Sequence, residues 1–116
     1  MSIERIQPGK RMSMAVSHNG VVYTAGQVAK ANAGKSVTEQ TTEILGLIDG
    51  LLAEAGTDKS KLLSATIFLS DMSTFQEMNE VWDSWVSPDN APARATVEAK
   101  LAAPKYTVEI MVIAAK

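Results

Sequence analysis

Cysteine is absent from this chain of 116 residues, and histidine occurs once, at position 18. Disulfides, zinc thiolates, iron–sulfur clusters and thiol nucleophiles are therefore excluded. A single histidine also excludes a metal site built from several histidines, so we expect no metal. His18 precedes Asn19-Gly20, a pair typical of a tight hairpin turn. We therefore expect His18 to be a solvated hairpin residue and not a ligand.

Long hydrophobic runs and an excess of positive charge are also missing. No apolar stretch is long enough to span a bilayer, and Met1–Arg5 lacks the basic-then-apolar order of a secretory signal. We therefore expect a cytoplasmic protein with no membrane partner. The 11 lysines and arginines against 13 acidic residues give a net charge of -2, with no basic stripe that could follow a phosphate backbone. This balance argues against nucleic acid as the main partner.

What remains is the composition of an ordinary globular domain. Hydrophobic residues make up 46% of the chain and charged residues 21%. A chain of 116 residues falls within the usual size range of one domain. It buries roughly two-thirds of the surface that its unfolded form exposes, which is enough for one core. We expect residues 1–116 to form a single domain.

The most regular pattern is an amphipathic helix that begins after Ser36. Ser36-Val37-Thr38-Glu39 has the form of a capping box, with the serine accepting and the glutamate reaching back. Apolar residues recur at helical spacing until Gly56, which ends the helix. Gly46 and Gly50 lie inside it, each costing on the order of 1 kcal/mol relative to alanine. Either this weakness is tolerated, or another subunit packs closely over that face.

A shorter helix follows a second apparent capping box, Ser73-Thr74-Phe75-Gln76. Its apolar stripe consists of Phe75, Met78, Trp82 and Trp85, and the aromatics in it are expected to anchor the core. Alternating segments predict strands at Ile3–Gln7, Met12–His18, Val21–Val28, Leu62–Ser70, Ala91–Glu98 and Tyr106–Ala114.

Both predicted helices are amphipathic along a single stripe, which favours an α+β fold. The economical arrangement is a single mixed β-sheet with the two helices on one face. The outward residues of the other face are too polar for a second helix layer and too weakly charged for a simple solvated surface. That mismatch indicates oligomerisation through the sheet.

Two opposite charges lie in strand-like segments that otherwise look half-buried. Arg94 offers a planar fork of donors that suits a carboxylate and stays charged at any working pH. Glu109 shares its strand face with Thr107, Met111 and Ile113, an apolar setting in which an unpaired carboxylate would be costly. On two neighbouring strands the two charges are either a structural ion pair or the floor of a site. Spacing alone leaves both interpretations open.

Three segments, Asn19–Gln27, Ala91–Val97 and Val108–Ile110, together resemble the Rid family, the reactive intermediate deaminases also called RidA or YjgF-like. The likeness extends over essentially the whole chain. It implies a chorismate-mutase-like fold in which three protomers pack their sheets into a central barrel, with a cleft between each pair. It also implies hydrolysis of 2-imino acids to 2-keto acids and ammonia, with no metal and no organic cofactor.

The resemblance assigns two catalytic positions. Arg94 matches the clamp for the substrate carboxylate, and Glu109 matches the residue that holds and activates the attacking water. This chemistry is plausible in its own right. A bidentate arginine fixes the carboxylate and hence the face of the C=N bond. A carboxylate in contact with water can accept its proton and later return it to the departing ammonia.

Five further positions are implied to bind substrate. Gly26 lies where backbone comes near the ligand, and Asn79 matches an asparagine that lines the cleft. Thr96 stands where the better-known members have cysteine, at a position where backbone groups matter. Met12 and Ala25 stand where those members carry tyrosine and often serine. The two changes remove a phenol and a hydroxyl that could orient the substrate.

Three functions follow from these observations. The first is a homotrimeric imine deaminase with sites between subunits. The second is a non-catalytic module that binds or senses 2-keto acids, keeping the Arg94 clamp after turnover was lost through Met12 and Ala25. The third is a protein-interaction, chaperone-like or ribonuclease role. Binding without deamination would favour the second function, and activity that survives Arg94→Ala would favour the third.

Overall fold

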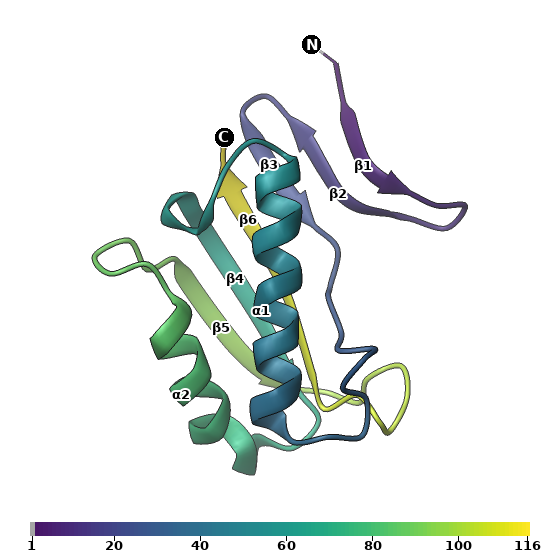
Figure 1. Ribbon diagram of the computed structural model, residues 1–116, viewed down its shortest axis with the longest axis vertical. Coiled ribbons are helices and arrows are strands. Elements are labelled where there is room, and N and C mark those ends of the chain that lie inside the picture. The colour runs from purple at the N-terminus through teal and green to yellow at the C-terminus, as the bar shows by residue number, and fades with distance from the viewer. Residues whose placement is uncertain (1) are drawn as a thin grey trace.

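The computed structural model describes residues 2–116, which form one six-stranded mixed sheet with two α-helices on one face (Figure 1). The strand order across the sheet is β1-β2-β3-β6-β4-β5. Every pair is antiparallel except β4 and β5, which are parallel and joined through α2. The elements are β1 (Glu4–Pro8), β2 (Ser13–His18), β3 (Val21–Thr24), α1 (Val37–Glu54), β4 (Leu62–Leu69), α2 (Phe75–Trp85), β5 (Ala93–Glu98) and β6 (Val108–Ala115).

The predicted fold class is confirmed, and the long helix follows its sequence signals closely. Ser36 accepts a hydrogen bond from the Glu39 backbone N–H at 3.1 Å, and its hydroxyl donates to the Glu39 carboxylate at 3.1 Å. At the other end Gly56 has φ +87°, the left-handed conformation that terminates helices. The Asn19-Gly20 hairpin is also confirmed, because both residues have positive φ.

Two local predictions are wrong. The second capping box does not form, because Thr74 precedes α2 without a side-chain cap. Asp71 instead accepts from the Ser73 N–H at 2.9 Å and caps a short 3-10 turn that leads into the helix. The third strand ends at Thr24 and not at Val28.

The core lies between α1, α2 and one face of the sheet. The side chains with essentially no solvent exposure come from α1, α2 and the central strands β3, β4 and β6. Truncating such residues to alanine typically costs about 2–5 kcal/mol. The largest of them are Ile44, Leu45, Ile48, Leu52, Ile67, Leu69, Met78, Ile110, Val22, Val108 and Val112.

Gln40 is a fully buried polar side chain that ties the start of α1 to the segment before β6. Its Nε2 donates to the carbonyls of Lys35 at 3.0 Å and Lys105 at 3.1 Å, and its Oε1 accepts from the Thr107 N–H at 3.0 Å. Both its N–H donors and its amide oxygen bond backbone groups, of which the Lys105 carbonyl also accepts from the Gly34 N–H at 2.8 Å.

Gln40→Leu should therefore lower the free energy of unfolding by about 2–4 kcal/mol, because the Lys35 carbonyl and the Thr107 N–H lose the buried amide as partner, while the Lys105 carbonyl keeps only the Gly34 N–H. Denaturant unfolding at constant protein concentration measures the change. Gln76→Leu, at an exposed position of α2, should stay within about 0.5 kcal/mol of the parent. A Gln40→Leu variant as stable as the parent would contradict this account of the buried amide.

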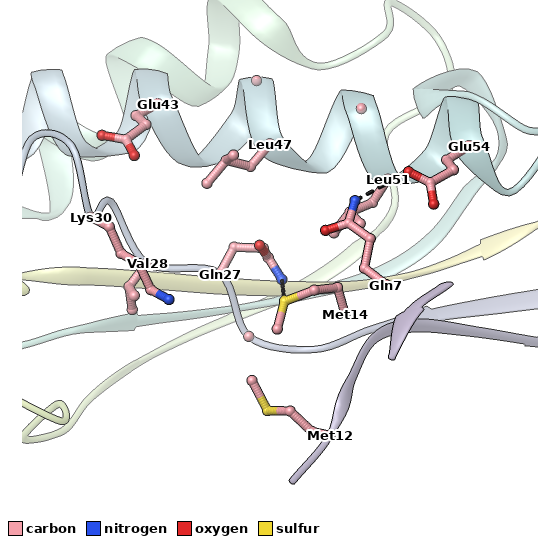
Figure 2. Close-up of a pocket in the computed structure, with 13 residues that line it drawn as sticks. Gln7, Met12, Met14, Gln27, Val28, Lys30, Glu43, Leu47, Leu51 and Glu54 are labelled. Atoms are coloured by element: carbon pink, nitrogen blue, oxygen red, sulfur yellow. Dashed lines mark hydrogen bonds between the residues drawn. The ribbon is translucent and has the colours of Figure 1, made fainter. Parts of the chain in front are cut away.

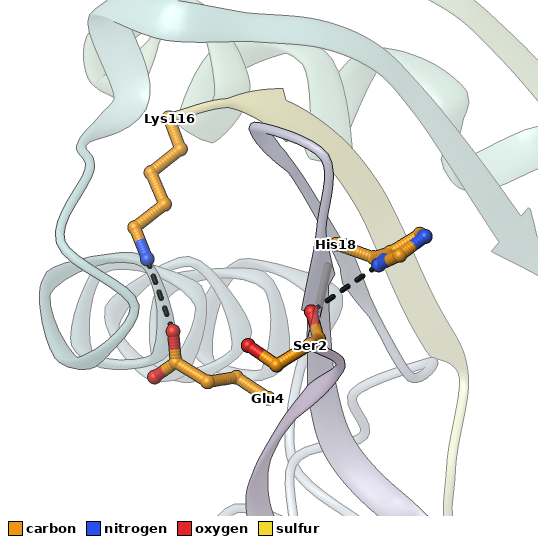
Figure 3. Close-up of polar contacts among 4 residues, drawn as sticks. All are labelled: Ser2, Glu4, His18 and Lys116. Atoms are coloured by element: carbon orange, nitrogen blue, oxygen red, sulfur yellow. Dashed lines mark hydrogen bonds and ion pairs between the residues drawn. The ribbon is translucent and has the colours of Figure 1, made fainter.

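Lys116 lies close to the start of β1 and the β2–β3 hairpin (Figure 3). Lys116 Nζ lies 3.2 Å from Glu4 Oε1, which is the one ion pair found among residues 2–116. His18 is half-buried beside its turn and contacts the Ser2 carbonyl at 3.3 Å. Both contacts are at the surface, where an ion pair contributes at most about 1 kcal/mol.

Both helices cover the same face, and the opposite face has no helix over it (Figure 1). Residues of the strands that alternate with the buried ones make up this uncovered face. It is largely apolar: Tyr23 is 46% exposed, Val97 41% and Met111 38%. Exposed apolar side chains gathered on one face are typical of surfaces that bind a ligand or another protein. Neither α-helix of the described chain is long and apolar enough to cross a membrane.

Candidate functional site

Arg94 lies on the helix-covered face of the sheet, at its edge. β5 is an edge strand, and within it Arg94 pairs with Ala65, whose side chain is buried under the helices. The guanidinium carbon lies 5.8 Å from the ring centroid of Phe75 and 5.3 Å from that of Trp82, both on α2. Arg94 is half-buried, yet among residues 2–116 no carboxylate forms an ion pair with it. Its N–H donors are therefore available to a ligand.

Two buried oxygens without partners accompany this guanidinium. Thr96 pairs with the buried Ile67, so it shares the helix-covered face with Arg94. Asn79 follows Phe75 by about one helical turn and so lies on the same side of α2. Thr96 Oγ1 and Asn79 Oδ1 are both shielded from solvent and lack a hydrogen bond within residues 2–116. Buried polar atoms are rarely left unpaired, so this pair indicates a place for a polar ligand.

Glu109 lies on the opposite, uncovered face. It pairs with Phe68 of β4, whereas Arg94 pairs with Ala65, and residues three apart in a strand point to opposite faces. β4 also separates β5 from β6, so the two charges are not on neighbouring strands as the sequence suggested. The hypothesis of a structural ion pair within one protomer is therefore wrong. One protomer does not bring the two predicted catalytic residues together.

Gly26 and Glu109 do meet. After β3 ends, Gln27 rejoins the sheet through paired backbone hydrogen bonds with Ile110, of 2.8 and 3.1 Å, which places Gly26 beside Glu109. A Cβ built on Gly26 would overlap Glu109 Oε2 and lie 2.9 Å from its Cδ. Because Gly26 has no side chain, the Glu109 carboxylate occupies the space where a Cβ would lie. β3 ends just before this close approach.

Gly26→Ala should therefore displace the Glu109 carboxylate while leaving the fold intact. The overlapping group is the end of a flexible side chain, so the expected stability change is within about 1 kcal/mol. Any activity that needs the carboxylate in place should fall about 10- to 100-fold, because a shift of about 1 Å at a reacting group has that effect. Steady-state kinetics measure the loss. In a Glu109→Gln background the same substitution should add little.

Of the remaining two predicted residues, Met12 lines a groove of the described chain (Figure 2), and Ala25 precedes Gly26 in the same lining. This groove has a volume of about 470 Å³ and runs between α1 and the segments around β1, β2 and residues 26–30. Met12 is 50% exposed and lines it together with Gly26. Ala25 is half-buried next to Gly26, and its N–H donates to the Met14 carbonyl at 2.8 Å. Arg94 is not among the groove's lining residues.

Two glycines of α1, Gly46 and Gly50, lie along this groove, and a Cβ on either would meet nothing within 4 Å. Within one protomer, then, no element packs closely over them. Glu43, also in the lining, is held by the loop at Ala31 and Asn32. Burial alone would raise the pKa of Glu43, but hydrogen bonds from the Asn32 side chain and the backbone N–H groups of Ala31 and Asn32 lower it. The Glu43 carboxylate in the groove lining is therefore already hydrogen-bonded to the loop at Ala31 and Asn32.

Phe75 and Trp82 were predicted as core anchors, and their contact with Arg94 was missed. A signal for it exists in the sequence. The two aromatics are seven residues apart on either side of Asn79, so all three lie on one stripe of the helix. Because α2 leads directly into the Arg94 strand, that stripe must lie near the arginine.

The chain is similar to known proteins over its full length. The family model described as "Endoribonuclease L-PSP" matches residues 2–116. A RutC family protein from Haemophilus influenzae is 50% identical over 114 residues, 98% of each chain. The RutC family protein YoaB from Escherichia coli is 44% identical over 115 residues, 99% of each chain. The crystal structure of a YjgF family member from Neisseria meningitidis has a TM-score of 0.96 at 45% identity, covering 100% of this chain and 96% of that one.

Proposed function

Because the chain belongs to the Endoribonuclease L-PSP family, whose members include RutC and YjgF proteins, we propose that it hydrolyses 2-imino acids to 2-keto acids and ammonia. The observation that carries this proposal is the half-buried Arg94 guanidinium, which has no ion-pair partner among residues 2–116. It lies in the same α2–β5 space as two buried oxygens that lack partners. A free guanidinium in such a setting fits a small carboxylate that carries a second polar group.

We place the reaction in clefts between protomers of a homotrimer. Glu109 lies on the uncovered apolar sheet face, and Arg94 lies on an edge strand with its side chain on the other face. If the uncovered faces pack together around a threefold axis, the edge of one protomer comes beside the uncovered face of the next. Arg94 of one protomer and Glu109 of its neighbour then share a site that a single protomer lacks.

Arg94 acts first in this mechanism by binding the substrate carboxylate with two parallel N–H···O bonds, which fixes the face of the C=N bond. Asn79 Oδ1 accepts from the imine N–H, and the Thr96 hydroxyl donates to the carboxylate, so both buried oxygens gain partners. These contacts orient the imine carbon toward the water held by Glu109.

Glu109 then moves the protons. It accepts a proton from water as the water oxygen bonds to the imine carbon, and passes that proton to the imine nitrogen to give a neutral tetrahedral amino alcohol. Glu109 then accepts the proton of the new C2 hydroxyl and passes it to the same nitrogen, the C–N bond breaks with its electron pair staying on nitrogen, and ammonia leaves as the C2 oxygen becomes the keto group. One water is consumed for each imine. Protons are conserved because the carboxylate ends in the state in which it began.

The test generates 2-iminobutyrate or 2-iminopropionate enzymatically and follows its decay with and without the protein. We expect micromolar protein to accelerate the decay, with release of one ammonia for each keto acid formed. A decay rate that does not change on adding the protein would overturn the proposal.

A second candidate is a module that binds 2-keto acids without turnover. It is favoured by Met12 and Ala25, which offer no side-chain donor beside Gly26. Calorimetry would then show 2-keto acid binding that requires Arg94 in a protein that does not hydrolyse imines. The family description also names an endoribonuclease, but the net charge of -2 gives no support for RNA binding.

A further inference from the structure

The guanidinium of Arg94 is held by aromatic rings and not by a carboxylate. It lies 5.3 Å from the Trp82 ring centroid and 5.8 Å from that of Phe75, within the roughly 6 Å range of cation–π attraction. We propose that Phe75 and Trp82 form an aromatic clamp that positions Arg94 to bind the substrate carboxylate. This inference rests on the proposed function for the identity of the ligand.

The acidic residues of the same two elements are directed elsewhere. Glu77 of α2 accepts from the backbone N–H and the hydroxyl of Thr38, both at 2.9 Å. Glu98 of β5 accepts from the Met72 N–H at 2.8 Å. The other two acids of α2, Glu80 and Asp83, are exposed. No competing anion from these elements therefore occupies the Arg94 donors.

An aromatic clamp suits a residue that must bind an anion. A free arginine side chain has many rotamers, and this conformational entropy is lost when the side chain is fixed in one orientation. A carboxylate partner would restrict the side chain but would also occupy its donors and neutralise its charge. Ring faces attract the cation while leaving the N–H groups unpaired. Part of the conformational entropy of the Arg94 side chain is then lost before the substrate binds. Less is lost on binding, so the substrate binds more tightly.

The other aromatic residue of α2 provides a matched control. Trp85 donates from Nε1 to Asp49 at 2.9 Å and lies 5.2 Å from Lys59 Nζ, so it contacts α1 and the turn before β4 instead of Arg94. Like Phe75 it is half-buried and packs against the core. Trp85 also packs on Trp82, with 5.3 Å between the ring centroids, so a substitution at Trp85 reports the loss of an aromatic that supports the clamp without removing a ring that faces the guanidinium.

The experiment compares Phe75→Leu, Phe75→Tyr and Trp85→Leu with the parent and with Arg94→Ala. Calorimetry with 2-oxobutyrate gives the dissociation constant, and the imine assay gives kcat and KM. Phe75→Leu should raise the dissociation constant and KM about 3- to 10-fold with kcat little changed. Phe75→Tyr, which retains a ring face, should bind as the parent does. Trp85→Leu should weaken binding less than Phe75→Leu does, because both rings that face the guanidinium remain.

A ligand-free measurement separates the clamp from the function. The chain has three arginines, Arg5, Arg11 and Arg94, so its arginine Nε–H signals are easily assigned by NMR. In the parent and in Phe75→Tyr, the neighbouring rings should displace the chemical shift of the Arg94 Nε–H from that of a free arginine. In Phe75→Leu, this chemical shift should move toward the value of a free arginine.

Unchanged binding in Phe75→Leu, or a loss no greater than that in Trp85→Leu, would overturn the aromatic clamp while leaving the proposed function standing. Normal 2-oxobutyrate binding by Arg94→Ala would instead overturn the carboxylate-binding role of Arg94, whatever the NMR spectrum shows.

Discussion

Arg94→Ala should reduce kcat/KM for 2-imino acids by about 100-fold or more, because a bidentate charge-assisted contact with the substrate carboxylate is lost. Binding of 2-oxobutyrate should become undetectable at millimolar concentration. Stability should change little, since Arg94 forms no ion pair among residues 2–116 and is only half-buried. The imine-decay assay and calorimetry measure the two effects.

Arg94→Lys provides the control for this prediction. It retains the positive charge but loses the planar fork, so we expect an intermediate loss of about 10-fold. If Arg94→Ala hydrolysed imines at the rate of the parent, the guanidinium would have no role in the reaction. A protein-interaction, chaperone-like or ribonuclease role would then be the better account.

Glu109→Gln should slow the chemical step while leaving ligand binding nearly intact. The amide fills the space beside Gly26 but cannot accept a proton from water, so kcat should fall about 10²- to 10⁴-fold. The dissociation constant of 2-oxobutyrate should stay within about threefold of the parent, since the carboxylate is bound by Arg94. Single-turnover kinetics and calorimetry separate these two quantities.

Glu80→Gln removes an exposed carboxylate from α2 and should leave both kcat and binding unchanged. A Glu109→Gln variant with the kcat of the parent would show that the proton is moved by another group. A variant that lost binding and turnover together would instead show that Glu109 shapes the site and does not act in the chemical step.

The sheet and both helices could be predicted because their signals are local. The capping serine at position 36 and the glycine at position 56 delimit α1, and alternation marks each strand. The end of β3 could not be predicted in this way. It depends on Gly26 approaching Glu109, a contact between segments far apart in the chain.

The relation between Arg94 and Glu109 shows where sequence reasoning stops. Alternation within a strand predicts which residues share a face only when strand order and register are known. β4 lies between β5 and β6, and its register with each of them places the two charges on opposite faces. Neither the strand order nor the register can be read from the spacing of residues in the sequence. The same residues that look like a pair in sequence are therefore separated by the sheet itself.

In the trimer that we propose, this separation gives the uncovered face a specific role. A site that needs both residues takes them from different protomers, so the proposed reaction requires assembly. Dissociated protomers should retain the fold but lose the site. On this proposal, the apolar surface around Tyr23, Val97 and Met111 brings a second chain to the carboxylate.

Subunit complementation tests this claim most directly. Arg94→Ala and Glu109→Gln proteins are unfolded, mixed in equal amounts and refolded together, and imine hydrolysis is compared with that of each variant refolded alone. If each site joins Arg94 of one protomer to Glu109 of its neighbour, random mixing leaves about one site in four with both residues intact, and about a quarter of the parent activity should return. Activity no greater than the mean of the two separate variants would contradict a site shared between protomers.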